Sequence, residues 1–269
     1  MRLLHPFLVT AGGAVILFLT ACQTSPRPSD SATMEVSPEF PNGRPFFDDF
    51  TAAALDESIW EIGVWWEHGG QTGRERTYLR DGRLHMALVN DPEEGILSSA
   101  LQTRESFLFG RWEASLKPSA VPGVLNSFYT IDWNGGDGSR QEIDIEFLTY
   151  TFAEDRGEVH LAVHARDRRS WSVDIPLNFN PADDFHVWGF EITPEHIQWF
   201  VDDTILHTYV YADNPVAIDR PYQLKFNVWT QEAWIHGPPE EGVESVYEIE
   251  WIRFTPAPRP SSSTTRQGT

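Results

Sequence analysis

Eight segments of this chain alternate between apolar and polar residues with a period of two, and no long helical periodicity accompanies them. Period two is the signature of a β-strand, because successive side chains of a strand point to opposite faces. The segments are rich in Val, Ile, Phe, Tyr and Trp, and turn residues such as Asp81-Gly82 and Asp202-Asp203 interrupt the pattern. Many short strands predict an all-β sandwich of two stacked sheets. The segments are 82–89, 110–118, 158–166, 170–177, 185–193, 196–210, 222–229 and 246–254.

A further alternating segment, QEIDIEF (141–147), carries Glu142, Asp144 and Glu146 at every second position. On a strand, these acids share one face and the apolar residues between them share the other. No basic residue alternates with the acids to offset their repulsion. Crowding raises the pKa of at least one of them and leaves a proton to donate. The row therefore suggests a carboxylate-based catalytic site, and the alternative is a strand with acids on its solvent face.

The net charge of −20 disfavours nucleic acid as a partner, because an acidic protein repels phosphate backbones. Hydrophobic residues make up 41% of the chain and include 11 Trp, which is ample material for a core. Segments rich in Ser, Pro and Thr flank the patterned region and predict a disordered linker at 23–44 and a disordered tail at 256–269. One folded domain, 45–255, is expected between them, as a monomer.

The N-terminal segment 1–22 has a basic start at Arg2, followed by an apolar stretch too short for a comfortable membrane span. It ends in Leu19-Thr20-Ala21-Cys22, and Cys22 is the only cysteine of the chain. The ending resembles a bacterial lipobox, which implies a signal peptide and a lipidated Cys22 that anchors the protein to a membrane surface without spanning it. The expected location is the cell envelope, with the outer membrane favoured by Gln23.

The motif EIDIEF resembles the E-x-D-x-E signature of glycoside hydrolase family 16. The likeness is closest to the branch of bacterial lichenases and plant xyloglucan transglycosylases, and it extends in the family's order over nearly all of residues 46–254. It implies a jelly-roll β-sandwich of two antiparallel sheets with a concave carbohydrate-binding cleft. The other segments that carry it are FFDDFTAAALDESIW, FGRWEASLKPS, NSFYTIDWNGGDG, FHVWGFEITPEHIQWFVDD and FNVWTQEAWIHG.

The resemblance implies roles for the three acids in a retaining reaction. Glu142 is expected to be the nucleophile, Glu146 the acid/base, and Asp144 the residue that shares a proton or hydrogen bond with Glu142. Retention requires two carboxyls about 5–5.5 Å apart, one to attack the anomeric carbon and one to protonate the leaving oxygen. No cofactor is expected.

Six residues are substrate-binding candidates by position in the family pattern. Four of them also have a structural explanation: Trp229 in the core, Tyr129 in inner-sheet packing, Trp133 at the sandwich edge, and His164 on the surface. A structural calcium near Glu250 is an additional expectation from the family, although Asp is the usual residue there. The six candidates are Tyr129, Trp133, His164, Asn227, Trp229 and Trp234.

We expect a membrane-tethered, endo-acting glycosidase whose partner is a polysaccharide. A neutral β-glucan is preferred, mixed-linkage β-1,3-1,4-glucan first. The donor-side residues differ from those of lichenases, since Arg140 precedes the first Glu and GILSSALQT (95–103) stands on an upstream strand. Alternatives are a transglycosylase, a hydrolase of galactans or sulfated marine polysaccharides, for which RDRRSW (166–171) supplies basic residues, and a non-catalytic sugar-binding lipoprotein.

Overall fold

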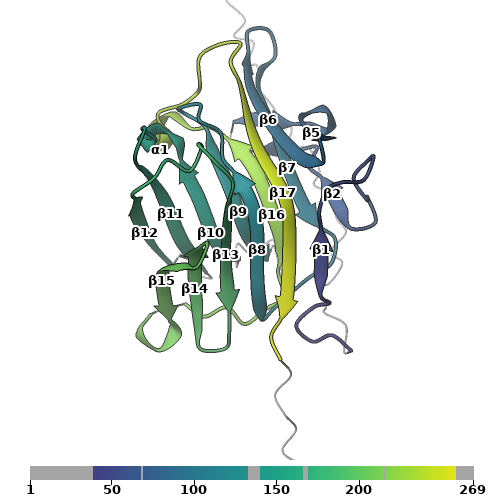
Figure 1. Ribbon diagram of the computed structural model, residues 1–269, viewed down its shortest axis with the longest axis vertical. Helices are drawn as coiled ribbons and strands as arrows, with labels where there is room; N and C mark the ends of the chain where they lie inside the picture. Colours follow the sequence, from purple (N-terminus) through teal and green to yellow (C-terminus); the bar gives the residue numbers. More distant parts are fainter. Residues whose placement is uncertain (1–38, 68, 133–139, 166–168, 215, 259–269) are drawn as a thin grey trace, which may run out of the picture. The chain divides into compact units, whose positions relative to one another are not determined.

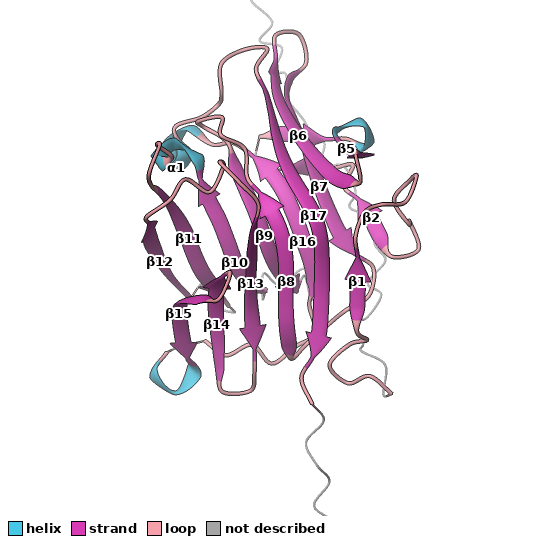
Figure 2. Ribbon diagram, in the orientation of Figure 1, coloured by secondary structure: helices cyan, strands magenta, loops and turns pink. Residues whose placement is uncertain are grey.

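The computed structural model describes residues 39–258, except 68, 133–139, 166–168 and 215. Strands dominate the described chain and confirm the expected all-β, jelly-roll-like sandwich (Figure 2). Cys22 and Trp133 lie outside the described residues.

The short helices of the described residues are α1 (Glu232–Ile235) and the 3₁₀ helices Arg74–Arg76, Thr149–Thr151 and Tyr211–Asp213. The strands are β1 Phe46–Asp48, β2 Trp60–Ile62, β3 Trp66–Glu67, β4 Gly70–Thr72, β5 Thr77–Arg80, β6 Arg83–Asp91, β7 Gly95–Thr103, β8 Gly110–Lys117, β9 Leu125–Asp132, β10 Gln141–Leu148, β11 Gly157–His164, β12 Ser170–Leu177, β13 His186–Ile192, β14 His196–Val201, β15 Thr204–Val210, β16 Gln223–Trp229 and β17 Glu244–Pro256.

All eight alternating segments form strands, and their bounds differ from the expected ones by a few residues. Segment 196–210 is a hairpin, β14–β15, that reverses at Asp202-Asp203. Asp81 and Gly82 make the two-residue turn between β5 and β6, both with positive φ, as a tight hairpin requires. The turn residues named from the sequence therefore mark true chain reversals.

The first sheet contains the acid-bearing strand, β10, near its middle. Its order is β12–β11–β10–β9–β16–β7–β2, and every neighbouring pair is antiparallel. We call the face that carries Glu142, Asp144 and Glu146 the acid-bearing face. The concave cleft expected on this face stays a prediction.

The second sheet runs β15–β14–β13–β8–β17, and β17 also pairs with β6 and β1. Figure 1 shows β1 (purple) beside β17 (yellow), so the two ends of the described chain are neighbours. Strand β7 belongs to both sheets, because residues 99–102 pair with β16 and residues 95–97 pair with β6. The sandwich is therefore continuous along this side.

The core lies between the sheets and is rich in aromatic side chains. Phe147 of β10 meets Trp188 of β13 edge-on, with ring centroids 4.8 Å apart, and Phe128 of β9 lies 5.1 Å from Phe190 of β13. All four side chains are fully buried. Burying each one contributes about 1.5–3 kcal/mol, so this interface holds the backbone of β9 and β10 in place.

No helix among the described residues is long and apolar enough to cross a membrane.

Candidate active site

The alternation of β10 separates its residues between the core and the acid-bearing face. Ile143 and Ile145 are fully buried in the core. Asp144 is 4% exposed, while Glu142 and Glu146 are half-buried on the opposite face. The apolar residues fix the strand in the sandwich, and so the three acids are held in one row by the backbone itself.

The neighbouring strands place polar residues beside these acids. Opposed residues of antiparallel strands share a face, with Cβ atoms about 4.5–5.5 Å apart. On β11, His164 opposes Glu142 and His160 opposes Glu146. On β9, Tyr129 opposes Asp144. The register therefore confirms that Tyr129 and His164 lie on the same face as the acids.

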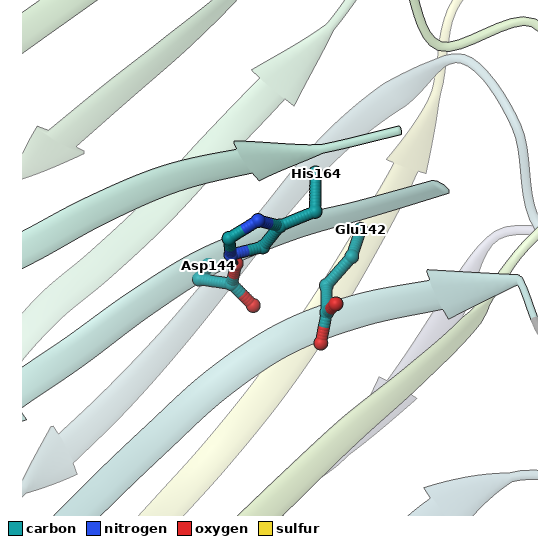
Figure 3. A group of neighbouring side chains, drawn as sticks. All are labelled: Glu142, Asp144 and His164. Carbon is teal, nitrogen blue, oxygen red and sulfur yellow. Dashed lines mark ion pairs between the residues drawn. The ribbon is translucent and has the colours of Figure 1, made fainter. Parts of the chain in front are cut away.

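His164 and Asp144 form the centre of this arrangement. The Nε2 atom of His164 lies 3.4 Å from Oδ2 of Asp144, and Figure 3 shows the imidazole leaning over the carboxyl group. Burial lowers the pKa of His164 to about 4, with help from the charge of Arg140. Burial, followed by the charges of Glu142 and Glu146, holds the pKa of Asp144 well above its usual range. At neutral pH the His164 imidazole is therefore uncharged, and the surroundings of Asp144 favour its protonated form.

Glu146 and Glu142 have different electrostatic surroundings. Burial, and then the charge of Glu142, raises the pKa of Glu146 to about 8, against a lowering effect of Arg140. The guanidinium Nε of Arg140 lies 2.8 Å from Oε2 of Glu142 and places a positive charge directly beside that carboxylate. A protonated carboxyl and a carboxylate on one strand are the acid and the nucleophile that retaining glycoside cleavage uses.

A polar network occupies the acid-bearing face on the β9–β16 side of the acids. The amide of Asn227 on β16 donates to Oε1 of Glu67 (3.0 Å) and to the hydroxyl of Tyr129 (3.3 Å). The indole of Trp65 donates to the other oxygen of Glu67 (2.8 Å). Burial and then the charge of Glu67 raise the pKa of Tyr129. Asn227 was expected here, and Glu67 is an additional acid that sequence reasoning missed.

Sequence reasoning missed Glu67 because its strand, β3, contains only two residues. The adjacent Trp65-Trp66 pair is the local signal that stands out in the sequence, and Trp66 is 69% exposed. Lys225 also reaches this part of the face, with its Nζ 5.5 Å from the centroid of the Trp65 ring.

Two of the candidate tryptophans lie together beyond the Glu146 end of β10. Trp229 is 7% exposed and packs with Leu125, Leu148 and Ile235, so most of its ring is covered. Trp234 of α1 is half-buried against this cluster, with its ring centroid 5.7 Å from that of Trp229. Sugar contact by either tryptophan stays a prediction, and Trp234 has the more accessible ring.

The loop that carries Trp234 is fixed by a close backbone approach. Thr230 donates a 2.6 Å hydrogen bond to the carbonyl of Gly123. A Cβ atom at Gly237 would lie 1.9 Å from the Thr230 hydroxyl and 2.3 Å from the Gly123 carbonyl oxygen. Only glycine fits there, and the contact sets the position of α1.

The residues around Glu250 do not fit a calcium site. Its two carboxylate oxygens accept from Arg83 (3.2 Å) and Ser115 (2.8 Å), so a guanidinium already occupies the position that a cation would take. Among the described residues, Glu142, Asp144 and His164 are the one group of three metal-ligating types, with ligand atoms within 4.8 Å of one another. The carboxylate chemistry predicted for these acids needs no metal.

Comparison with known proteins gives a consistent family match. The family described as Glycosyl hydrolases family 16 matches residues 66–253. A β-glucanase from Paenibacillus macerans is 25% identical over 75% of this chain and 84% of its own length. A glucan endo-1,3-β-glucosidase from Cryptopygus antarcticus is 22% identical over 72% and 80%. The structure of the Bacillus licheniformis β-glucanase superposes with a TM-score of 0.70 at 18% identity, covering 80% of this chain and 99% of the other, which shows a shared fold.

Proposed function

This chain belongs to glycosyl hydrolases family 16 and hydrolyses O-glycosyl bonds; from that premise, we propose that it is a retaining, endo-acting β-glucanase with Glu142 as nucleophile. The observation that carries the proposal is the unequal surroundings of two carboxyls on β10. Glu146, with a pKa of about 8, holds a proton at neutral pH. Glu142 lies beside the Arg140 guanidinium, which favours a carboxylate.

In the first half-reaction, a carboxylate oxygen of Glu142 attacks the anomeric carbon of the sugar. Glu146 gives its proton to the glycosidic oxygen as the bond to the leaving sugar breaks. The product is a glycosyl ester on Glu142, which no longer carries a negative charge. Asp144 lies between the two glutamates and, with its raised pKa, has a proton to hydrogen-bond with Glu142.

In the second half-reaction, Glu146 acts as a base. It takes a proton from water while the water oxygen attacks the anomeric carbon, and the ester bond to Glu142 breaks. Glu146 is thereby protonated again and Glu142 regains its negative charge beside Arg140. Two inversions at the anomeric carbon leave the product with the β-configuration of the substrate.

The proposed substrate is a neutral β-glucan, with mixed-linkage β-1,3-1,4-glucan first. Support comes from the relatives, which are named β-glucanase and glucan endo-1,3-β-glucosidase. The acid-bearing face also suits a neutral chain, because it combines aromatic and hydrogen-bonding side chains with several carboxyl groups. The network of Glu67, Asn227 and Tyr129 would contact the donor-side sugars, which stay on the enzyme as the glycosyl ester.

A panel of polysaccharides tests the proposal. We expect cleavage of mixed-linkage β-glucan, with the product appearing first as the β-anomer by proton NMR. Activity should change little with added salt, since stacking and hydroxyl contacts are weakly screened. Cleavage of sulfated galactan alone, or an α-anomer as first product, would contradict the proposal.

We also propose that Cys22 is lipidated and tethers the mature enzyme to the outer membrane. The apolar stretch before Leu19-Thr20-Ala21-Cys22 and the Gln at position 23 support this. Fractionation of cells that express Cys22→Ser is the test. The variant should stay unprocessed while the wild-type protein is processed and sediments with outer membranes.

A further inference from the structure

A row of three side chains crosses β10, β11 and β12 at the Glu146 end of the site. Glu146 opposes His160 in the β10–β11 ladder, and His160 opposes Asp174 in the β11–β12 ladder. Opposed residues of antiparallel strands share a face and are direct neighbours. The acid/base is therefore flanked by a histidine, and the histidine by a further carboxylate.

His160 and Asp174 form a close pair. Nδ1 of His160 lies 2.5 Å from Oδ1 of Asp174, and the two side chains are 16% and 56% exposed. An ionised carboxylate only accepts hydrogen bonds, so Nδ1 carries the hydrogen and Nε2 is the ring nitrogen left for another partner. Nε2 of His160 is therefore the ring atom available to a sugar hydroxyl, and the half-exposed Asp174 has a second oxygen that accepts from another.

The ring of Trp234 completes this group. It meets His160 edge-on, with centroids 5.2 Å apart, and its other side packs on the cluster of Trp229 and Leu148. The apolar cluster and the Gly123–Gly237 contact hold the indole in position. A fixed, half-exposed indole beside two hydrogen-bonding side chains suits a sugar ring, which has an apolar C–H face and a polar rim.

The order of residues along β10 decides which sugar binds there. Leu148, which contacts the Trp234 cluster, follows Glu146 on the same face, whereas Glu142 lies on the other side of Glu146. Glu146 protonates the oxygen of the leaving sugar, so that sugar lies nearer to Glu146 than to the nucleophile. We propose that Trp234, His160 and Asp174 bind the leaving-group sugar, an inference that rests on the proposed retaining mechanism.

The same site has a consequence for the second half-reaction. A free glucan end bound there places one of its hydroxyl groups near Glu146. Glu146 takes the proton of that hydroxyl group while the hydroxyl oxygen attacks the anomeric carbon. The ester bond to Glu142 breaks, a new glycosidic bond forms, and the product is a longer glucan instead of a hydrolysed one. The site therefore sets the partition between sugar and water as acceptor.

The test compares two substrates that share donor sugars and differ in the leaving group. One is a mixed-linkage gluco-oligosaccharide, whose leaving group is a sugar; the other is its 4-nitrophenyl glycoside, cleaved to nitrophenol. Asp174→Asn and His160→Gln should each lower kcat/KM on the oligosaccharide about tenfold. This is the loss expected when one hydrogen bond between the leaving sugar and the His160–Asp174 pair is removed. The nitrophenyl glycoside has no sugar in its leaving group, so both variants should lose much less kcat/KM on it than on the oligosaccharide, and both should form fewer transglycosylation products.

His186→Gln is the matched control. His186 also pairs through Nδ1 with an aspartate, Asp202 (2.9 Å), and packs against an aromatic ring, but it belongs to the other sheet. It should leave both substrates unaffected. If the His160 and Asp174 variants lose equal activity on both substrates, or lose none, the leaving-sugar site is wrong. If the wild-type enzyme cleaves neither substrate, the proposed β-glucanase function is wrong instead.

Discussion

The indole Nε1 of Trp199 donates a hydrogen bond to the backbone carbonyl of Asp144, 3.1 Å away. Trp199 belongs to β14 of the second sheet, and Asp144 is the middle acid of β10 in the first. Both residues are almost fully buried. This bond joins the two sheets at the backbone of the acid-bearing strand, so the second sheet helps to position the acids directly.

Replacing Trp199 by Phe should lower the free energy of unfolding by about 2 kcal/mol, because it removes both buried volume and this hydrogen bond. Trp188→Phe is the matched control. Trp188 is equally buried, and its Nε1 has no hydrogen-bond partner among the described residues. Trp188→Phe should lower the free energy of unfolding by about 1 kcal/mol less than Trp199→Phe does. Urea titrations measure both, and equal losses would show that the Trp199–Asp144 bond contributes nothing.

Glu142→Ala should lower kcat by roughly 10³-fold or more, because the covalent step is lost. Added azide should restore cleavage by attacking the anomeric carbon from the vacated side, which gives an α-glycosyl azide. Glu146→Ala should instead keep activity on substrates whose leaving group needs no proton, and azide should then give the β-glycosyl azide. NMR of the two azide products assigns the roles, and the opposite pairing would exchange the nucleophile and the acid/base.

Removing the charge of Arg140 should move the alkaline limb of kcat/KM to higher pH. This limb reports the loss of the Glu146 proton, and the Arg140 charge lowers the pKa of Glu146. Arg140→Gln therefore raises that pKa, whereas Arg140→Lys keeps a positive charge and should hold the limb near the wild-type position. A pH–rate profile of the three proteins is the measurement, and a limb that moves downward in Arg140→Gln would contradict the electrostatic role.

Glu146→Gln should become more stable relative to wild type as the pH rises. The folded protein keeps the Glu146 proton up to a pKa of about 8, while an unfolded chain releases it near the ordinary value of 4.5. Between these pH values the native state binds more protons than the unfolded state does. The free energy of unfolding of the wild-type protein therefore falls with rising pH and levels off above about pH 8. Glutamine does not titrate. The difference in Tm, variant minus wild type, should increase by roughly 3 °C or more between pH 5 and pH 8.5; parallel curves would exclude the raised pKa.

The sequence predicts the acid-bearing strand and its burial pattern well, because the information for both is local. Strict alternation over QEIDIEF determines which side chains face the core, and the structure follows it through Ile143 and Ile145. The eight alternating segments form strands for the same reason. Their order in the sheets follows from pairing between distant segments, and composition and periodicity do not specify it.

The parts of the site that sequence reasoning missed depend on long-range register. Glu67 lies on a strand of two residues and meets Asn227 through a hydrogen bond across 160 positions. His160 and Asp174 become partners only once β11 pairs with β12. Trp229 packs with Leu125, Leu148 and Ile235, which come from three other segments, and its contact with sugar stays a prediction. No local pattern in the chain contains these contacts.

The position of β10 within its sheet governs how the enzyme loses its structure. Ladders with β9 and β11 bond the strand along both sides, so its amides exchange with deuterium only when two neighbouring strands separate. The free energy of amide exchange at Ile143 and Ile145 should therefore equal the free energy of global unfolding. The three acids of β10 should therefore keep their arrangement until the whole sandwich opens, and thermal inactivation should coincide with the loss of β-structure instead of preceding it.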